Sequence, residues 1–336
     1  MNKDDFTRTL VSAAVRKGIR DIENDSRRSA RNLVDLGAFF AKTKRQKEFF
    51  KKVQKLLTDP NSAYYPLVEA LVRRTDAQTM ETVCVNVGYG SWTSGARKLR
   101  QVSQAQALCV PWALTFDLTG GADGIDVPAL VAQANELGVF SFFLFLGEEG
   151  TVPDGLIQAL KAFGTSAFFI FCSSAAPIEQ AGVNMMFSFE ATAPEFEAQW
   201  ADALERRLFA GVHRLYTDED VESIVSGRVT DEATALELPF VCLVASEQCS
   251  VQARKCVQEY VIASRYGQEY PLICFDFPDD VLYINRVISD GAPLLVYRGS
   301  DGAVTVSGQK EPLCKGGLPL KEVCALLYAY REGCHA

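Results

Sequence analysis

Histidine is nearly absent from this sequence of 336 residues, in which only His213 and His335 occur. The cysteines never form a C-x-x-C pair, so no recognised zinc pattern can be assembled. No uncharged apolar run reaches about 18 residues, the length that predicts a membrane-spanning helix. The first ten residues, MNKDDFTRTL, lack the apolar core of a signal peptide. We therefore expect a cytoplasmic protein with no metal site and no membrane association.

Several catalytic motifs are also missing. Neither a G-x-S-x-G elbow nor a P-loop occurs, so acyl transfer and nucleotide hydrolysis have no local support. Gly88, Gly90 and Gly95 form only an incomplete dinucleotide-binding fingerprint, because the third glycine is misplaced and no acidic residue follows at the required distance. We interpret this segment as a turn in a linker.

The ten cysteines stand mostly inside apolar runs such as PFVCLVA and PLICFDF. A free cysteine packs like a small apolar residue, so we interpret them as buried, reduced thiols rather than as disulfides. The even spacing of Cys242, Cys249 and Cys256 crosses from a predicted strand into a helix, which argues against a shared metal ion.

Charge is unevenly distributed along the chain. Residues 1–100 contain 20 Lys and Arg against 11 Asp and Glu, whereas the remainder contains 14 against 31. Such asymmetry can indicate a nucleic-acid or partner surface. The segment KTKRQKEFFKKVQKLL fits an amphipathic helix with a solvated basic face, and no aromatic stacking positions are interleaved with it. We therefore do not expect nucleic-acid binding.

Apolar residues recur at helical spacing over residues 5–74, which predicts a helical N-terminal unit. From Val110 onward, short apolar runs alternate with helical patterns, which is typical of an α/β fold with a mostly parallel sheet. An Asp-Gly turn at 301–302 indicates a β-hairpin near the C-terminus, followed by a helix over 320–331. The predicted strands are 113–117, 139–146, 167–172, 185–190, 211–217, 239–245 and 272–275.

The order of these segments, with CVNVGYGSWTSGARKLR at 84–100 and VPWAL at 110–114, resembles a clade of radical S-adenosylmethionine (SAM) proteins. The resemblance implies a partial (β/α)6-type, TIM-like barrel with a small N-terminal helical domain, and a SPASM-like C-terminal β-hairpin plus helix. The segments it implies are a helical domain (1–81), a linker (82–109), the partial barrel (110–280) and the hairpin with its helix (281–336).

The first strand of that family leads into a loop bearing C-x-x-x-C-x-x-C, whose three thiolates hold a [4Fe–4S] cluster and leave one iron open to chelate SAM. Here the strand ends in TFDLT and passes to the short glycine-rich turn GGADG, with Cys109 alone before it. A segment resembling the auxiliary-cluster region has Val287 and Gly308 where ligand cysteines would stand. The sequence therefore predicts that both cluster sites are lost.

Remnants of the SAM site follow other strands. The family's G-G-E motif corresponds to Gly147, Glu148 and Glu149, and Glu148 would place a side chain where the family needs close backbone approach. The segment SFE at 188–190 resembles the family's S-V-E, whereas a family T-N-G is replaced by CSS at 172–174. Ligands of parallel sheets bind beyond the carboxyl ends of the strands. The predicted pocket rim is Asp117, Gly147, Glu148, Glu149, Ser188 and Glu190.

Three hypotheses follow. The first is a non-catalytic, radical-SAM-like protein without a cluster or other expected cofactor, which binds a small molecule such as SAM or a related nucleoside, or a protein partner such as a cluster-bearing relative. The second is an enzyme repurposed for non-radical acid/base chemistry through the rim carboxylates, because chemistry in barrels resides on loops. The third is a purely structural scaffold. No catalytic residue is assigned.

Overall fold

A curved sheet organises the chain in this computed structural model, which describes residues 3–122, 124–147, 153–174, 176–289, 291–309 and 311–333. Within these residues the sheet has the strand order β10-β9-β8-β1-β2-β3-β4-β5-β6-β7. Neighbouring strands from β1 to β7 are parallel, and β8 pairs parallel to β1. The strands are β1 (Ala113–Leu118), β2 (Ser141–Leu146), β3 (Ala167–Cys172), β4 (Met185–Glu190), β5 (Ala210–Tyr216), β6 (Phe240–Ala245), β7 (Ile273–Phe277), β8 (Leu295–Arg298), β9 (Ala303–Val306) and β10 (Pro312–Lys315).

The sheet curls toward a barrel. Phe277, at the end of β7, contacts rings of β2 and β3, with centroids 5.0 Å from Phe145 and 5.9 Å from Phe171. These strands lie several positions apart in the strand order, so contact is possible only if the sheet folds round on itself. The expected partial barrel, with helical and hairpin additions, is therefore confirmed.

Helices cover the outer face of the sheet, where the most deeply buried side chains lie. Phe116, Phe142 and Phe168 are fully buried on successive strands, with ring centroids 6.3 Å and 5.3 Å apart. No helix in the described ranges is long and apolar enough to cross a membrane. The barrel helices are α7 (Val127–Leu137), α8 (Leu156–Leu160), α9 (Ala176–Glu179), α10 (Phe196–Glu205), η2 (Asp218–Asp220), α11 (Val221–Val225), α12 (Arg228–Ala235), α13 (Val251–Gly267), α14 (Asp279–Ile288) and α15 (Leu320–Gly333).

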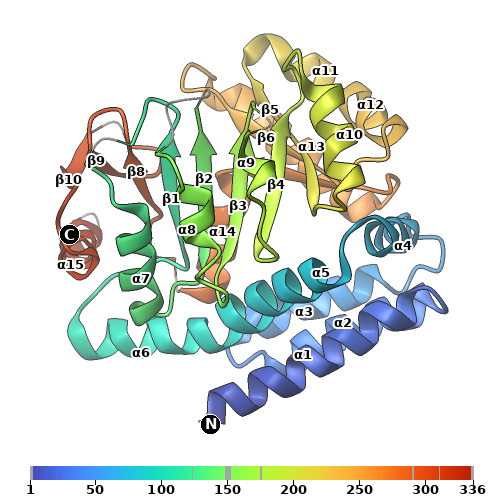
Figure 1. Cartoon of the computed structure of the whole chain (residues 1–336), viewed down its shortest axis with the longest axis horizontal. Coiled ribbons are helices and arrows are strands. Elements are labelled where there is room, and N and C mark those ends of the chain that lie inside the picture. Colours follow the sequence, from blue (N-terminus) through green and yellow to red (C-terminus); the bar gives the residue numbers. More distant parts are fainter. Residues whose placement is uncertain are drawn as a thin grey trace.

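The N-terminal helices lie beneath the amino ends of the strands, as Figure 1 shows. A chain of edge-to-face aromatic contacts ties them to the barrel, running from Phe49 to Trp92, Trp112 and Phe143 with centroid distances of 5.3, 6.5 and 6.1 Å. The base of the barrel is therefore closed, and the carboxyl ends of the strands point away from these helices. These helices are α1 (Lys3–Ile22), α2 (Ser26–Phe40), α3 (Lys44–Leu56), α4 (Tyr64–Arg74), α5 (Ala77–Val85), η1 (Asn86–Gly95) and α6 (Ala96–Gln106).

The glycine-rich segment expected as a linker turn is helical instead, and that expectation is wrong. Residues 86–95 form a π-helix that continues α5 directly into α6. Asn86, which is fully buried, donates hydrogen bonds to the carbonyls of Gly164 and Ser166 and so fixes this segment to the barrel. A Cβ atom at Gly95 would lie 2.5 Å from the carbonyl oxygen of Gly138, so glycine is required for close backbone approach.

The C-terminal hairpin forms as expected, but it joins the main sheet rather than standing apart. β8 pairs with β1, β9 pairs with β8, and β10, which the sequence analysis did not predict, extends the edge. Helix α14 was also not predicted, and it contains Val287 as a largely buried apolar residue. Gly308 lies in a turn after β9 with a φ of +82°.

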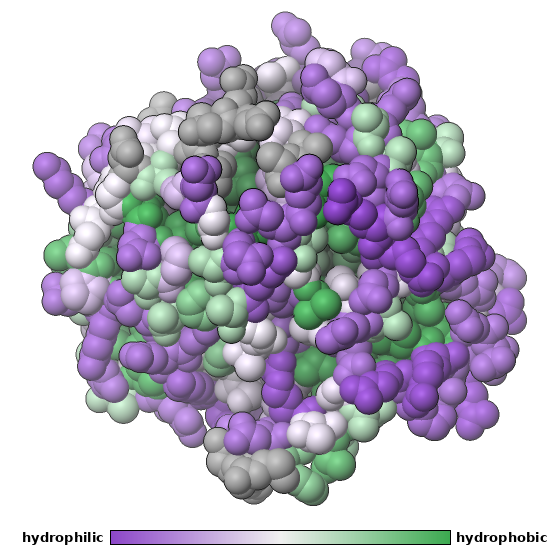
Figure 2. Space-filling view, viewed as in Figure 1, coloured by the Kyte–Doolittle hydropathy of each residue, from purple (hydrophilic) through white to green (hydrophobic). Residues whose placement is uncertain are grey.

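The outer surface mixes residue types. In Figure 2, hydrophilic residues cover most of the visible face, and hydrophobic residues form separate small groups between them. Small exposed apolar groups of this kind are ordinary for a folded domain. This face therefore gives no reason to place the functional site outside the barrel.

Candidate functional site

The predicted rim residues within the described ranges gather at the carboxyl end of the barrel. Asp117 lies opposite Phe145 in the register of β1 and β2, and Ser188 lies opposite Phe171 in the register of β3 and β4. Directly paired residues in parallel strands lie on the same face of the sheet. Glu190 lies two positions after Ser188 on β4, so its side chain is on that face as well. Gly147 follows the last residue of β2. Glu148 and Glu149 lie outside the described residues.

The inner side of the carboxyl end of the barrel, where Asp117, Ser188 and Glu190 lie, is called the mouth below. Stacked phenylalanines form its floor, and the sequence analysis did not anticipate them. Phe143 stacks on Phe169 with centroids 4.8 Å apart, and Phe145 stacks on Phe171 at 4.3 Å. Phe277 closes the group from the far side, 5.5 Å from Phe143. In SFFLFL every residue after Ser141 is apolar, and AFFIFC is apolar throughout, so periodicity could not show which phenylalanines face inward.

His213 is a site residue that the sequence analysis left without a role. It lies opposite Glu190 in the register of β4 and β5, and its ring meets Phe171 edge to face at 5.3 Å. The side chain is 6% exposed, and Nδ1 has no hydrogen-bond partner among the described residues. Burial lowers the pKa of His213 to about 4, against a smaller opposing effect from a hydrogen bond with the Ser188 backbone. The imidazole is therefore neutral at physiological pH.

Two further side chains complete this side of the mouth. Ser188 is only 4% exposed, and its buried hydroxyl has no hydrogen-bond partner in the described structure. Leu215, two residues beyond His213 and therefore on the same face, is 52% exposed. An exposed leucine above unpartnered polar atoms and aromatic rings is a surface that a partly apolar ligand would cover.

The opposite side of the mouth is charged. The Asp117 carboxylate accepts hydrogen bonds from the Thr119 amide at 3.2 Å and hydroxyl at 2.6 Å, which fixes the start of the short loop after β1. Arg298 lies beside Asp117 in the register of β1 and β8, and its guanidinium pairs with Asp301 at 2.6 Å. Its Nε is buried without a partner in the described part of the chain. The mouth therefore combines both charge signs.

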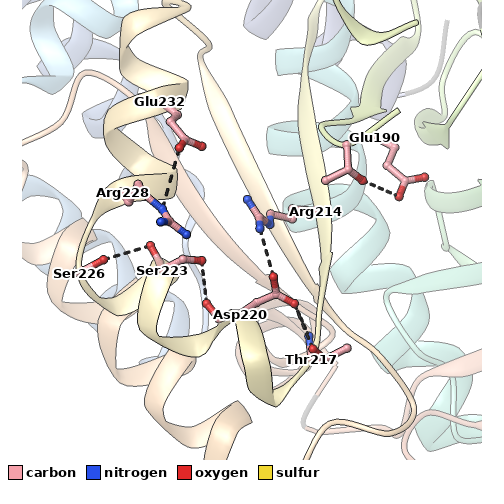
Figure 3. A network of polar contacts seen from close by, with 9 residues as sticks. Glu190, Arg214, Thr217, Asp220, Ser223, Ser226, Arg228 and Glu232 are labelled. Carbon is pink, nitrogen blue, oxygen red and sulfur yellow. Dashed lines mark hydrogen bonds and ion pairs between the residues drawn. The ribbon is translucent and has the colours of Figure 1, made fainter. Parts of the chain in front are cut away.

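A separate polar network braces the outer face of β5, as Figure 3 shows. Asp220 receives hydrogen bonds from the Thr217 amide and from Arg214, at 3.0 and 3.1 Å, and these bonds hold the pKa of its carboxyl below the usual range. Glu190 lies apart from this network and instead accepts a hydrogen bond from Thr192 at 3.1 Å. Glu190 is thus left available to the mouth.

The residues near β1 do not fit an iron–sulfur cluster. Residues 119–126 read TGGADGID and contain no cysteine, and the next cysteines in sequence are Cys109 and Cys172. Cys109 precedes β1 and is buried at its amino end. Cys172 is buried on the outer face, where burial raises the pKa of its thiol to about 12. Within the described ranges, no group of three or more His, Cys, Asp or Glu side chains could hold a metal ion.

Comparison with solved structures agrees with this architecture. SuiB from Streptococcus suis, a radical SAM protein, bound to the precursor peptide SuiA has a TM-score of 0.50 with this chain at 12% identity, over 76% of this chain and 72% of SuiB. The chain shares the fold of SuiB. SuiB bound to S-adenosylmethionine gives a TM-score of 0.47 at 14% identity, over 85% and 78% of the two chains. The sequence itself matches no protein-family model and no curated protein.

Proposed function

We propose that this chain is a radical-SAM-like protein that has lost its cluster and acts by binding a small molecule at the mouth of the barrel. The observation that carries the proposal is the lack of cysteine in the loop after β1, because the nearest cysteines in sequence, Cys109 and Cys172, are buried elsewhere. Three thiolates at one strand end are what a site-differentiated [4Fe–4S] cluster requires. Without them the carboxyl end of the barrel keeps residues that can contact a ligand but has no electron source.

The chemistry of the mouth favours a ligand with a flat apolar part and a polar edge. Half-buried Phe145 and Phe277 and exposed Leu215 offer apolar contact, and the Ser188 hydroxyl and His213 Nδ1 have no hydrogen-bond partner among the described residues. Buried polar atoms of this kind cost stability unless something satisfies them. SAM and related nucleosides belong to this class of ligand, and we propose them as the first candidates.

A thermal-shift titration tests the proposal with SAM, S-adenosylhomocysteine and methylthioadenosine. A ligand at one hundred times its dissociation constant should stabilise the protein by about 2.7 kcal/mol. Ser188→Ala should weaken binding roughly fivefold, because one hydrogen bond contributes about 1 kcal/mol. Ser103→Ala, on α6 beneath the amino ends of the strands, is the matched control and should bind as the wild type does. If none of the three compounds changes the melting temperature, the nucleoside class is wrong.

A second candidate function is acid/base catalysis without radicals. The specific observation in its favour is that Glu190 lies opposite His213, whose neutral imidazole has no hydrogen-bond partner at Nδ1 within the described part of the chain. A carboxylate beside a neutral imidazole can take up and pass on a proton. Loss of turnover in Glu190→Gln with ligand binding retained would favour this function over simple binding, and Asp117, Glu148 and Glu149 remain further carboxylates to test.

A protein or peptide partner is the remaining part of the proposal. SuiB, which shares the fold, is described with a precursor peptide bound. We propose that a partner of this chain, for instance a cluster-bearing relative, supplies the chemistry that the chain itself lacks. Co-purification from the native cytoplasm would identify such a partner.

A further inference from the structure

A cleft of about 210 Å³ lies at the amino end of the barrel, opposite the mouth. Its walls come from α4 of the N-terminal unit and from the barrel helices α10 and α12, at the right of Figure 1. Ala210, the first residue of β5, and Pro239, just before β6, also line it. An apolar cavity of roughly 150 Å³ holds a benzene molecule, so this cleft can take one aromatic ring with a short side chain.

Two apolar ridges line the cleft. On α10, Trp200 and Leu204 are four residues apart and therefore lie on one face of the helix. On α4, Leu67 and Leu71 are spaced in the same way. Leu204 is 37% exposed and Trp200 is half-buried, so apolar surface remains open to water between the two helices. An apolar group that covered this surface would bind favourably.

The entrance of the cleft carries a positive charge that no carboxylate neutralises in the described part of the chain. Arg73 lines the cleft and is exposed, and its guanidinium forms no ion pair or hydrogen bond with a described residue. Its neighbour Arg74 instead pairs with Glu237 and donates to the Glu237 carbonyl at 2.7 Å. Burial lowers the pKa of Arg74, and the nearby charge of Arg73 lowers it further.

Other groups bind the carbonyls at the end of α4, so the Arg73 side chain is not needed there. Arg207 donates to the carbonyls of Arg73 and Thr75 at 3.1 and 3.2 Å. The Thr75 amide donates to the carbonyl of Leu71 at 2.9 Å. Helix ends are stabilised when their last carbonyls find such partners. The Arg73 guanidinium therefore remains available to a ligand.

We propose that this cleft binds a small organic carboxylate with an apolar body, such as an aryl-substituted short-chain acid. The ring packs between Trp200 and the leucines of α4, and the carboxylate pairs with Arg73 at the entrance. A guanidinium binds a carboxylate through two parallel hydrogen bonds, which favours this anion over a neutral polar group. The cleft is too small for a whole nucleoside, because pockets for ligands of drug size measure about 300–1,000 Å³. The site thus differs from the mouth in both place and ligand.

Titration of the whole chain with phenylpropionate tests the site. The chain has three tryptophans, whose indole N–H groups give separate signals in a proton–nitrogen correlation spectrum. Trp200 lines the cleft, whereas Trp92 and Trp112 contact each other at the base of the barrel with centroids 6.5 Å apart. The Trp200 signal, assigned with Trp200→Phe, should shift with a dissociation constant of about 1 mM, as expected for a ligand of this size. The other two signals should stay in place.

Arg73→Gln should weaken phenylpropionate binding about tenfold, because it replaces a charge-assisted pair with a neutral contact. Phenylpropanol, which has the same ring but no charge, should bind both proteins equally weakly. Arg206→Gln is the matched control, since Arg206 is paired with Asp202 at 2.8 Å and lies outside the lining of the cleft. This variant should bind phenylpropionate as the wild type does.

Three results would overturn the proposal. Phenylpropionate could leave the Trp200 signal unmoved, which would show that the cleft does not take this class of ligand. Arg73→Gln could bind phenylpropionate as tightly as the wild type, which would remove the carboxylate from the entrance. Arg206→Gln could weaken binding as much as Arg73→Gln does, and the effect would then come from net charge rather than from a defined contact.

Discussion

His213 should lower the free energy of unfolding by about 3 kcal/mol as pH falls from 6.5 to 4, and replacing it with glutamine should abolish this loss. The pKa of His213 is lowered from 6.5 to about 4 because the ring is buried. In this pH range the histidine binds a proton in the unfolded chain but stays neutral in the folded protein. The stabilising contribution of His213 is therefore present above pH 6.5 and is lost as pH falls toward 4.

Urea unfolding of wild type and His213→Gln at several pH values measures this effect as a difference, which removes the contribution of all other groups. Asp276→Asn is the control of opposite sign. The Asp276 pKa is raised from 3.8 to about 7, so its contribution is present at low pH and lost as pH rises through 7. The asparagine variant should gain about 3 kcal/mol on the wild type between pH 4 and pH 7. Parallel curves for wild type and His213→Gln would show that the ring is not buried as described.

Phe142→Ala should destabilise the protein by about 3–5 kcal/mol, whereas Phe145→Ala should cost distinctly less and weaken ligand binding instead. The two residues lie on the same strand and face opposite sides of the sheet. Phe142 is fully buried between Phe116 and Phe168 beneath the helices. Phe145 is half-buried in the mouth, where it stacks on Phe171. A cavity in the outer layer cannot collapse easily, but one in the mouth opens to solvent.

Equilibrium unfolding of both variants, together with the nucleoside titration, checks this division. Both variants remove the same number of atoms, so any difference reflects their surroundings. If Phe145→Ala proved as destabilising as Phe142→Ala and left binding unchanged, the stacked phenylalanines would be a second structural core rather than the floor of a site.

The carboxyl-end rim was predictable because a strand's last residue marks the functional edge of a parallel sheet. Asp117, Ser188 and Glu190 could therefore be placed from strand boundaries alone, and the structure puts them on the same face. His213 could not be placed in this way, since it lies mid-strand. A signal did exist: in AGVHRLY the histidine shares its face with Gly211 and Leu215, so a single polar side chain stands on an otherwise apolar face.

Other features lay beyond pattern reasoning for physical reasons. Gly88, Gly90 and Gly95 predicted a turn, but packing against the barrel holds them in a π-helix, since tertiary contacts override weak helix propensity. Arg298 lies at the mouth only because β8 pairs with β1, and pairing between strands that are distant in sequence has no local sequence signature. Asp276 is exceptional only through its burial, which one sequence does not reveal.

Anaerobic reconstitution with iron and sulfide, followed by iron analysis and an assay for 5′-deoxyadenosine, tests the central claim most directly. We expect a colourless protein without stoichiometric iron that leaves SAM intact, because the loop after β1 offers no thiolate to iron. A brown protein that holds about four irons per chain and cleaves SAM to 5′-deoxyadenosine would contradict the account.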